Sequence, residues 1–423
     1  MQLKTILNYV QRYKSFIYNS DRLAQEGEET VVEISIKARA NSRPVCSGCG
    51  KKRPGYDTLP ERRFEFVPLW GMAVFFLYAP RRVQCAPCGI KVERVPWAEG
   101  KSHLTTTYQW FLARWAKRLS WQQTARAFRT SWENVYRSVC MAVTWGLEQR
   151  SLDGIQAIGV DEIGWRKGHH YLTLVYQIEE GCKRLLYVGR DRTARSLLGF
   201  FRMLGPDRAS RQQRASQLRF VCSDMWQPYL KVIAKKAGEA VHVLDRFHIM
   251  AKMNKAIDEV RAAEAKRLKA EGYEHILKHS RWCLLKRPEN LTDQQTVKLQ
   301  ELQRYNLQSL RARLQREDFQ RFWEYQSPFW AAQFLVDWCQ RVMRSRIEPM
   351  KKVARMLDRH GPLILNWFLA KGTMSSGVVE GLNYNAKLSM KNAYGFRTEE
   401  SLKIALFHRL GALPELKSAH EFC

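Results

Sequence analysis

The chain has 423 residues, of which 70 are Lys or Arg and 41 are Asp or Glu, so its formal net charge is +29. This excess favours a polyanionic partner, because each phosphate that is neutralised releases condensed counterions. The most apolar stretch, residues 69–79, is far shorter than the roughly 20 residues of a membrane-spanning helix, and the N-terminus lacks a signal-peptide layout. We therefore expect a cytoplasmic or nucleoid protein of about three domains, with nucleic acid and no membrane as partner.

Residues 1–100 have the pattern of strands and turns. The segment Thr30–Lys37 alternates apolar and polar residues, which is the period of a half-buried strand. Two Cys-x-x-Cys-Gly motifs follow, with 35 residues between them, and supply Cys46, Cys49, Cys85 and Cys88. Four thiolates from two tight turns suit a structural Zn²⁺ ion, which is tetrahedral. A redox dithiol is the alternative, but it would not explain why the motif is paired.

From about residue 105 to residue 150 the pattern becomes helical. Ser120 and Gln123 form a capping-box signature, and a second helix is expected after Ser131. Two short helices joined by a turn, next to a zinc motif in a basic chain, predict a helix-turn-helix, although any two short helices joined by a turn look alike. The side chains of the second helix that a DNA major groove could receive are Trp132, Glu133, Asn134, Tyr136 and Arg137.

Residues 155–250 alternate between strand and helix patterns, which predicts a mixed sheet in an α/β domain. The expected strands are 155–163, 171–178, 184–189, 218–224 and 240–245, and the expected helices are 195–204 and 228–237. From Arg246 to about Ala370 the chain is almost wholly helical, with breaks where Pro and Gly occur.

Two acidic residues stand at the ends of expected strands. Asp161 ends the apolar run from Ile155, and Asp224 ends the run from Leu218. Carboxylates at strand tips bind Mg²⁺, and two such ions about 3.5–4 Å apart can activate a water and stabilise a leaving 3′ oxygen. A chain with 41 acidic residues also places some of them at strand ends by chance.

The whole chain resembles the transposases of the ISL3 insertion-sequence family, which have the RNase H-like fold of DDE transposases. The resemblance lies in both Cys motifs, the helical block after Thr105, and the segments 159–161, 221–229, 243–248, 375–383 and 392–397. The segments Asp245-Arg-Phe-His248 and Glu380-Gly-Leu-Asn383 are specific, whereas the Cys pairs alone would fit countless proteins.

The resemblance implies an RNase H-like α/β catalytic domain with a large all-α insertion, preceded by zinc-ribbon-like and helix-turn-helix DNA-binding domains. It makes Asp161, Asp224 and Glu380 a catalytic triad that binds two Mg²⁺ or Mn²⁺ ions. Asp245 and His248 match an Asp and a His found near that site, in a role that the sequence does not assign; a polar pair at a strand-to-helix corner is the alternative. The implied segments are 1–100 (strands and zinc site), 101–152 (helix-turn-helix), 153–250 (first part of the catalytic core), 251–370 (insertion) and 371–423 (core helices with Glu380).

Other charged residues near the triad are further candidates. Glu162 competes with Asp161, but strand alternation points the Glu162 side chain to the opposite face, so it ranks lower. If the segment after Glu380 is helical, Lys387, Lys391 and Arg397 are candidates for holding DNA phosphates near the metals. Solvated surface charge is the alternative for these three.

The expected function is that of a transposase that binds the terminal inverted repeats of its element on double-stranded DNA. Metal-dependent hydrolysis would free a 3′-hydroxyl, which then attacks target DNA. Pairing two ends implies at least a homodimer on DNA. The alternative is a catalytically inactive, transposase-derived regulator that binds specific DNA. A structure-specific nuclease such as a junction resolvase is a weaker third class, since it needs no dedicated sequence reader.

Overall fold

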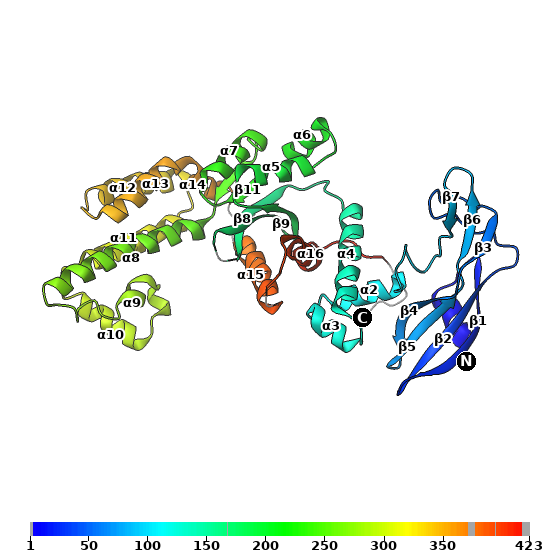
Figure 1. Cartoon of the computed structure of the whole chain (residues 1–423). Helices are drawn as coiled ribbons and strands as arrows, with labels where there is room; N and C mark the ends of the chain where they lie inside the picture. Colours follow the sequence, from blue (N-terminus) through cyan, green and yellow to red (C-terminus); the bar gives the residue numbers. More distant parts are fainter. Residues whose placement is uncertain (1–2, 167, 371–376, 394, 417–423) are drawn as a thin grey trace. The chain divides into compact units, whose positions relative to one another are not determined.

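The computed structural model describes residues 3–166, 168–370, 377–393 and 395–416 (Figure 1). Two compact units divide the chain: Met1–Ser151 with Leu388–Cys423, and Leu152–Lys387. Within the described ranges, no helix is both long and apolar enough to cross a lipid bilayer.

The first unit begins with helix α1 (Leu3–Val10) and a four-stranded sheet. The sheet has the order β1-β2-β5-β4, with β1 at Phe16–Glu26, β2 at Glu29–Ala38, β5 at Met72–Tyr78 and β4 at Arg62–Leu69. The strand predicted at 30–37 lies within β2, and its alternation buries Val32, Ile34 and Ile36. These side chains join an aromatic core in which Trp97 is 1% exposed.

A second, smaller sheet of the first unit carries the Cys motifs. Its order is β3-β6-β7, with β3 at Gly55–Thr58, β6 at Arg81–Cys85 and β7 at Gly89–Val92. Both pairings are antiparallel. Strand β6 ends at Cys85, so it carries the second Cys pair back toward the first.

Besides α1, the first unit contains helices α2 (Thr106–Trp115), α3 (Trp121–Ala127), α4 (Trp132–Gln149) and α16 (Glu399–Leu410). The predicted capping box is present: Ser120 caps α3, and the Gln123 side chain accepts from the Ser120 N–H at 3.0 Å. Ser131 caps α4, whose buried side includes Val135 and Val139. The segment after α16 packs on α4 at Gly146, where an added Cβ would lie 2.7 Å from the Leu413 Cβ.

The second unit is built around a five-stranded mixed sheet of order β10-β9-β8-β11-β12. The strands are β8 (Ala157–Arg166), β9 (His170–Glu179), β10 (Cys182–Arg190), β11 (Phe220–Ser223) and β12 (Val241–Leu244). The first three pair antiparallel, and β11 pairs parallel with both β8 and β12. All five predicted strands are therefore confirmed, with shifted ends.

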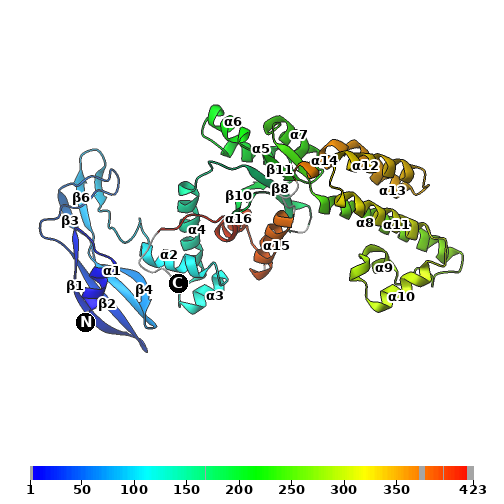
Figure 2. The same cartoon turned by 180° about the vertical axis from the view of Figure 1, so that it is seen from behind.

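Helices α5 (Ala194–Met203), α6 (Arg208–Ser216) and α7 (Gln227–Lys236) cover one face of this sheet (Figure 1). Ile158 and Val160 of β8 point to that face and join a core with Phe200 of α5 and Ile233 of α7. Helix α15 (Gly377–Asn392) lies against the other face, where Val379 meets β8 (Figure 2). The sequence pattern predicts α5 and α7 but not α6.

The region predicted to be helical after Arg246 is confirmed. It contains α8 (Arg246–Ala270), α9 (Arg281–Leu285), η1 (Pro288–Asn290), α10 (Asp293–Leu302), α11 (Gln308–Gln320), η2 (Arg321–Glu324), α12 (Pro328–Met343), α13 (Glu348–Arg359) and α14 (Gly361–Leu369). Pro lies in the first turn of η1, α12, α13 and α14, where a missing N–H costs no hydrogen bond. Its core is mostly aliphatic and contains a group of aromatic residues that includes Phe319, Phe322 and Trp338.

Candidate functional site

The four Cys residues of the two motifs come together beside the small sheet. All four are free thiols, and their Sγ atoms lie within 4.8 Å of one another, with 3.6 Å between those of Cys49 and Cys85. Sulfurs around a tetrahedral Zn²⁺ lie about 3.8 Å apart when each Zn–S distance is about 2.3 Å. The cluster therefore has the donor atoms and the spacing of a metal site.

The glycine after each Cys pair has a structural reason. Gly50 and Gly89 have φ angles of +68° and +72°, in the left-handed region that glycine enters without a steric penalty. The turn lets the Gly50 N–H donate to the Cys46 carbonyl at 2.9 Å. A hydrogen bond from the Lys51 backbone lowers the pKa of Cys49 to about 6, which favours the thiolate that binds metals.

The second helix of the α3–α4 pair exposes only some of the side chains predicted to contact DNA. Trp132 is 54% exposed, and Arg137 is exposed with an ion pair of 3.8 Å to Glu133. Tyr136 is half-buried, and its ring packs against α3 at a centroid distance of 5.1 Å. Asn134 is half-buried and donates to Thr130 at the helix start. The exposed members of the predicted set are therefore Trp132, Glu133 and Arg137.

Asp161 lies in the middle of β8, so the expectation that it stands at a strand tip is wrong. β9 pairs with β8 as far as Arg166, whereas β11 pairs with β8 only up to Val160. The apolar run ends at Asp161 because a partner strand ends there, and β8 itself continues. Asp161 is therefore the first residue of β8 beyond its parallel neighbour.

The Asp161 carboxylate is largely buried, with 14% of the side chain exposed. Its Oδ1 accepts from the Glu162 N–H at 2.8 Å, and its Oδ2 accepts from Nδ2 of Asn383. His248 Nε2 lies 3.9 Å from Oδ1. Burial raises the pKa of Asp161, and the charge of Asp224 adds to the increase, while His248 opposes it.

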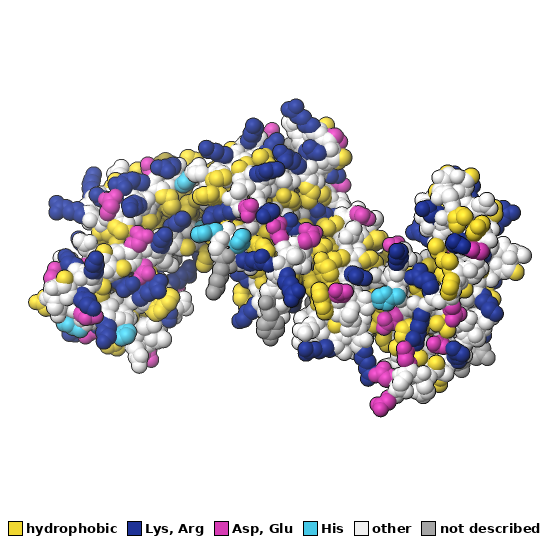
Figure 3. All heavy atoms as spheres, in the orientation of Figure 1, with side chains coloured by type: hydrophobic (Ala, Val, Ile, Leu, Met, Phe, Trp, Pro, Cys, Tyr) yellow, Lys and Arg dark blue, Asp and Glu magenta, His cyan; other side chains and the backbone are white. Residues whose placement is uncertain are grey.

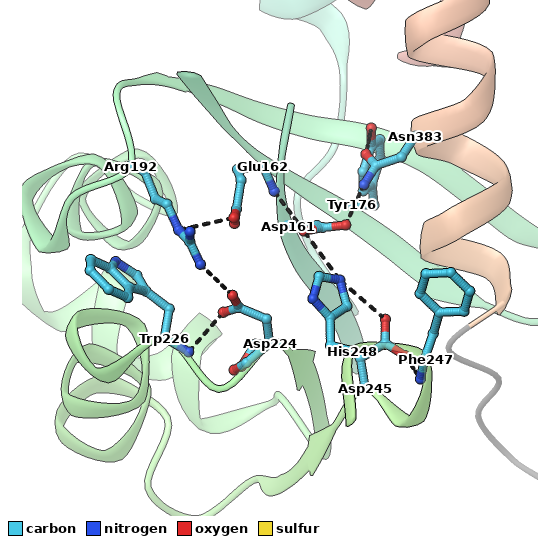
Figure 4. Close-up of polar contacts among 11 residues, drawn as sticks. Asp161, Glu162, Tyr176, Arg192, Asp224, Trp226, Asp245, Phe247, His248 and Asn383 are labelled. Atoms are coloured by element: carbon cyan, nitrogen blue, oxygen red, sulfur yellow. Dashed lines mark hydrogen bonds and ion pairs between the residues drawn. The ribbon is translucent and has the colours of Figure 1, made fainter. Parts of the chain in front are cut away.

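Asp224 directly follows β11, as predicted, and is held by an arginine. Nη2 of Arg192 donates to Asp224 Oδ2 at 2.6 Å, and the Trp226 N–H donates to the other oxygen at 3.0 Å. Nε of the same Arg192 lies 2.9 Å from Glu162 Oε1 (Figure 4). The guanidinium also lies over the Trp226 ring, 4.5 Å from its centroid. The Arg192 guanidinium thus contacts the carboxyl groups of both Asp224 and Glu162.

The side chains of Asp161 and Glu162 point to opposite faces of the sheet. Glu162 has the parity of Ile158 and Val160, which face α5 and α7, while Asp161 has the parity of Gly159, which faces α15. Glu162 still reaches the site through Arg192. Burial raises the pKa of Glu162 to about 8, and the charge of Asp224 contributes to the increase.

Asp245 and His248 connect the start of α8 to Asp161. Asp245 caps α8 by accepting from the Phe247 N–H at 2.8 Å, which is the corner role that the sequence analysis considers. His248 Nε2 lies 3.9 Å from both Asp245 Oδ2 and Asp161 Oδ1. The imidazole therefore stands between two carboxylates (Figure 4).

Glu380 lies in the first turn of α15, and its side chain is exposed. Asn383, one turn later, is buried and links the helix to the sheet, since it accepts from the Tyr176 hydroxyl at 2.8 Å and donates to Asp161. Residues three apart on a helix share a face, so Glu380 and Asn383 project on the same side. In the described residues, the carboxylate oxygens of Asp161, Asp224 and Glu380 do not all lie within 4.8 Å of one another. The Cys cluster is the one set of three or more potential ligands that they bring within 4.8 Å of one another.

Close packing at Gly159 brings the first turn of α15 onto the sheet. A Cβ at this position would lie 2.3 Å from Val379 Cγ2 and 3.2 Å from Ile178 Cγ2, so no larger residue fits without displacement. Val379 is 2% exposed and precedes Glu380. The glycine thereby determines how near the Glu380 turn lies to β8.

The remaining candidates are basic, and the sequence analysis missed one residue of the site. Lys387 and Lys391 are exposed on α15, and Arg397 is exposed in the segment before α16. Arg192 was not a candidate. Its signal in the sequence is the charged run Arg190-Asp-Arg192, which begins at the last residue of β10 and ends just before the N-cap Thr193.

Comparison with known proteins identifies the family. A family model for ISL3-type DDE transposases, described as "Transposase", matches residues 158–406, more than half of the chain. The chain belongs to the ISL3 family of transposases. It is 28% identical over 361 residues to the transposase for insertion sequence element IS1001 of Bordetella parapertussis, covering 84% of this chain and 86% of that protein. It is 26% identical over 421 residues to the transposase for insertion sequence element IS1557 of Mycobacterium tuberculosis (strain CDC 1551 / Oshkosh), covering 93% of this chain and 92% of that protein.

The ISL3 match begins in β8 and ends in α16, so it includes Asp161, Asp224 and Glu380. Members of a transposase family act on DNA, which agrees with the large positive charge of this chain. The similarity to both relatives extends over most of each protein.

Proposed function

We propose that this chain is a DDE transposase that binds the terminal inverted repeats of an insertion sequence and catalyses metal-dependent DNA cleavage and strand transfer. The observation that carries the proposal is the position of Asp161 and Asp224 where two adjacent parallel strands part, with Asn383 tying the helix of Glu380 to Asp161. Family membership supports the reaction class.

The catalytic core has the RNase H-like fold in this proposal. Its support is the sheet: three antiparallel strands are followed by two that run parallel to the first, with α5 and α7 on one face and α15 on the other. The proposed domain limits are 153–250 and 371–423 for the core, and 251–370 for the insertion; within the range 371–423, the residues from Leu388 onward belong to the first compact unit. The segment 371–376 lies outside the described residues.

Asp161, Asp224 and Glu380 would hold the catalytic cations in this proposal. Their oxygens are the ligands that Mg²⁺ and Mn²⁺ prefer, and the buried like charges of the two aspartates call for a counter-cation. When bound, two such ions supply an activated water and charge stabilisation of the leaving 3′ oxygen. Arg192, which already neutralises Asp224, is the chain's own counter-charge to that carboxylate.

The other site residues have orienting roles in the proposal. Asn383 fixes the rotamer of Asp161 through its amide, and Tyr176 fixes Asn383 in turn. His248 stands between Asp161 and Asp245 and can give either carboxylate a hydrogen bond after a small movement. Lys387, Lys391 and Arg397 would hold phosphates near the cations.

The first unit recognises the transposon ends in this proposal. The α3–α4 pair is a helix-turn-helix of residues 101–152, and Trp132 and Arg137 are its exposed candidates for groove contacts. The four Cys thiolates bind a structural Zn²⁺ in residues 1–100, supported by their mutual spacing. Because two ends must be joined, at least a homodimer assembles on DNA.

A nicking assay tests the proposal. The substrate is the DNA that flanks the gene, with any imperfect inverted repeats it contains, incubated with Mg²⁺ or with EDTA. Wild-type protein should nick at the repeat ends only with Mg²⁺, and Asp161→Asn should bind the same DNA without cutting. Cleavage by Asp161→Asn would remove Asp161 from the mechanism. Binding without any cleavage by the wild type would support the alternative of an inactive regulator.

A further inference from the structure

Helices α5, α6 and α7 enclose a groove of about 940 Å³ on the sheet face opposite α15. Its apolar lining comes from Leu198 and Phe201 of α5, Ala215 of α6 and Val232 of α7. These side chains also pack into the core below, so the groove has a firm floor.

The charged side chains that line the groove are all basic. The charged residues that line it are Arg202, Arg208, Arg211, Lys231, Lys235 and Lys236, and no acidic residue lines it. Figure 3 shows dark-blue side chains gathered around hydrophobic ones over α5 and α7. Lys231 and Lys235 lie one helical turn apart, about 6 Å along the axis. Both are exposed, and neither forms an ion pair or side-chain hydrogen bond within the described part of the chain.

Two residues that line the groove are close in sequence to residues of the carboxylate site. Ala194 of the lining is two residues after Arg192, and Gln227 directly follows Trp226. Trp226 is 39% exposed and lies against the Arg192 guanidinium that holds Asp224. An exposed indole directly before Gln227 of the groove lining offers a surface on which a base can stack.

We propose that this groove binds the sugar–phosphate backbone of the DNA strand that leaves the carboxylate site, with Lys231 and Lys235 as phosphate contacts. The proposal rests on the transposase function. A strand whose phosphodiester reacts at Asp224 must continue over neighbouring protein surface, and this groove is a neighbouring basic surface. An acidic patch of a second copy is a poorer occupant, because two chains of net charge +29 repel each other.

The test compares two double variants of the full-length chain. Lys231→Gln/Lys235→Gln removes two charges from the groove. The control Lys266→Gln/Lys278→Gln removes two exposed charges outside the groove, one near the C-terminal end of α8 and one in the segment that follows α8. The probe is a fluorescein-labelled DNA duplex of arbitrary sequence, titrated over a range of salt concentrations.

The groove variant should bind more weakly, and the slope of log K against log salt should become shallower by about two, because each phosphate contact contributes about 0.9. The control should keep the wild-type slope. An equal change in both variants, or no change in the groove variant, would overturn the assignment.

Lysine acetylation of the wild-type protein, read by mass spectrometry, gives an independent measurement. DNA should protect Lys231 and Lys235 more than Lys266 and Lys278. If instead the groove lysines become protected without DNA as protein concentration rises, a second copy occupies the groove and the proposal is wrong. Should the wild type fail to nick any DNA while DNA still protects these lysines, the transposase function fails and the groove assignment stands.

Discussion

Asn383 donates a hydrogen bond to Asp161 across 222 positions of sequence, and this bond joins α15 to the centre of the sheet. The amide also accepts from Tyr176, so its orientation is fixed on both sides. Since Glu380 is one turn away on the same helix, the position of one proposed acid depends on the hydrogen bond to another.

Replacing Asn383 should therefore weaken cleavage more than DNA binding. We expect Asn383→Ala to reduce the cleavage rate by roughly 10- to 100-fold, about 1.4–2.7 kcal/mol, because Asp161 loses its orienting donor. Tyr176→Phe removes only the hydrogen bond to the Asn383 carbonyl oxygen and leaves the donor to Asp161, so we expect it to lose less activity than Asn383→Ala. A wild-type rate in Asn383→Ala would show that the bond has no part in orienting Asp161.

The packing at Gly159 predicts a second effect on α15. Gly159→Ala should lower the free energy of unfolding by about 1–3 kcal/mol and reduce cleavage, because the new methyl group pushes Val379 and the Glu380 turn away from β8. In the same strand, Gly164→Ala should be nearly silent, since its Cβ would meet only the Tyr171 ring at 3.8 Å. The double variant Gly159→Ala/Val379→Ala should recover activity, and its failure to do so would argue against displacement of α15.

Arg192 predicts how the site responds to divalent cations. Without metal, Arg192→Gln should lower the melting temperature, because Asp224 and Glu162 lose their shared counter-charge. Mn²⁺ should then raise the melting temperature of the variant more than that of the wild type, since the ion replaces the missing charge. Arg190→Gln, which changes a 77%-exposed side chain, is the control. Equal shifts by Mn²⁺ in both proteins would contradict this role.

The Cys cluster predicts a metal requirement that is confined to the first unit. Wild-type protein should contain about one Zn²⁺ per chain, and Cys49→Ser should lose it and expose residues 44–94 to limited proteolysis. The second unit should keep its thermal transition. Cys182→Ser, on β10, should leave the zinc content unchanged. Full zinc content in Cys49→Ser would exclude the proposed ligand set.

His242 predicts a loss of stability in acid. It is buried on β12, within 2.8 Å of the Ser223 hydroxyl, and burial lowers its pKa to about 4. The unfolded chain takes up this proton near pH 6.5 and the folded chain only near pH 4, so stability present above pH 6.5 is lost as the pH falls toward 4.

The loss attributable to His242 is at most about 3 kcal/mol. Urea unfolding of the second unit between pH 7 and pH 4 measures it. His242→Gln should flatten the dependence, whereas His275→Gln, at an exposed position, should retain it. An unchanged slope in His242→Gln would assign the acid sensitivity to other groups.

The sequence was sufficient for most elements of the second unit because their patterns are strong. It was insufficient where the hydrophobic pattern indicates which residues are buried but not where a strand ends. The apolar run stops at Asp161, but pairing with β9 continues β8 to Arg166. Helix α6 has little apolar periodicity and buries only Ala215, so periodicity does not reveal it. Arg192 joins Asp224 and Glu162 through a long side chain from a loop, a contact that depends on tertiary geometry.

The segment from Gly377 onward contributes to both compact units: residues 377–387 complete the sheet unit, and residues 388–416 pack with the helices near the N-terminus. This segment is synthesised after residues 3–370, which form most of both units. A translation product that ends before Gly377 would lack residues that belong to each of the two units, and it would also lack Glu380. Truncated translation products of such a gene should therefore be poor substitutes for the whole enzyme, whichever unit they retain.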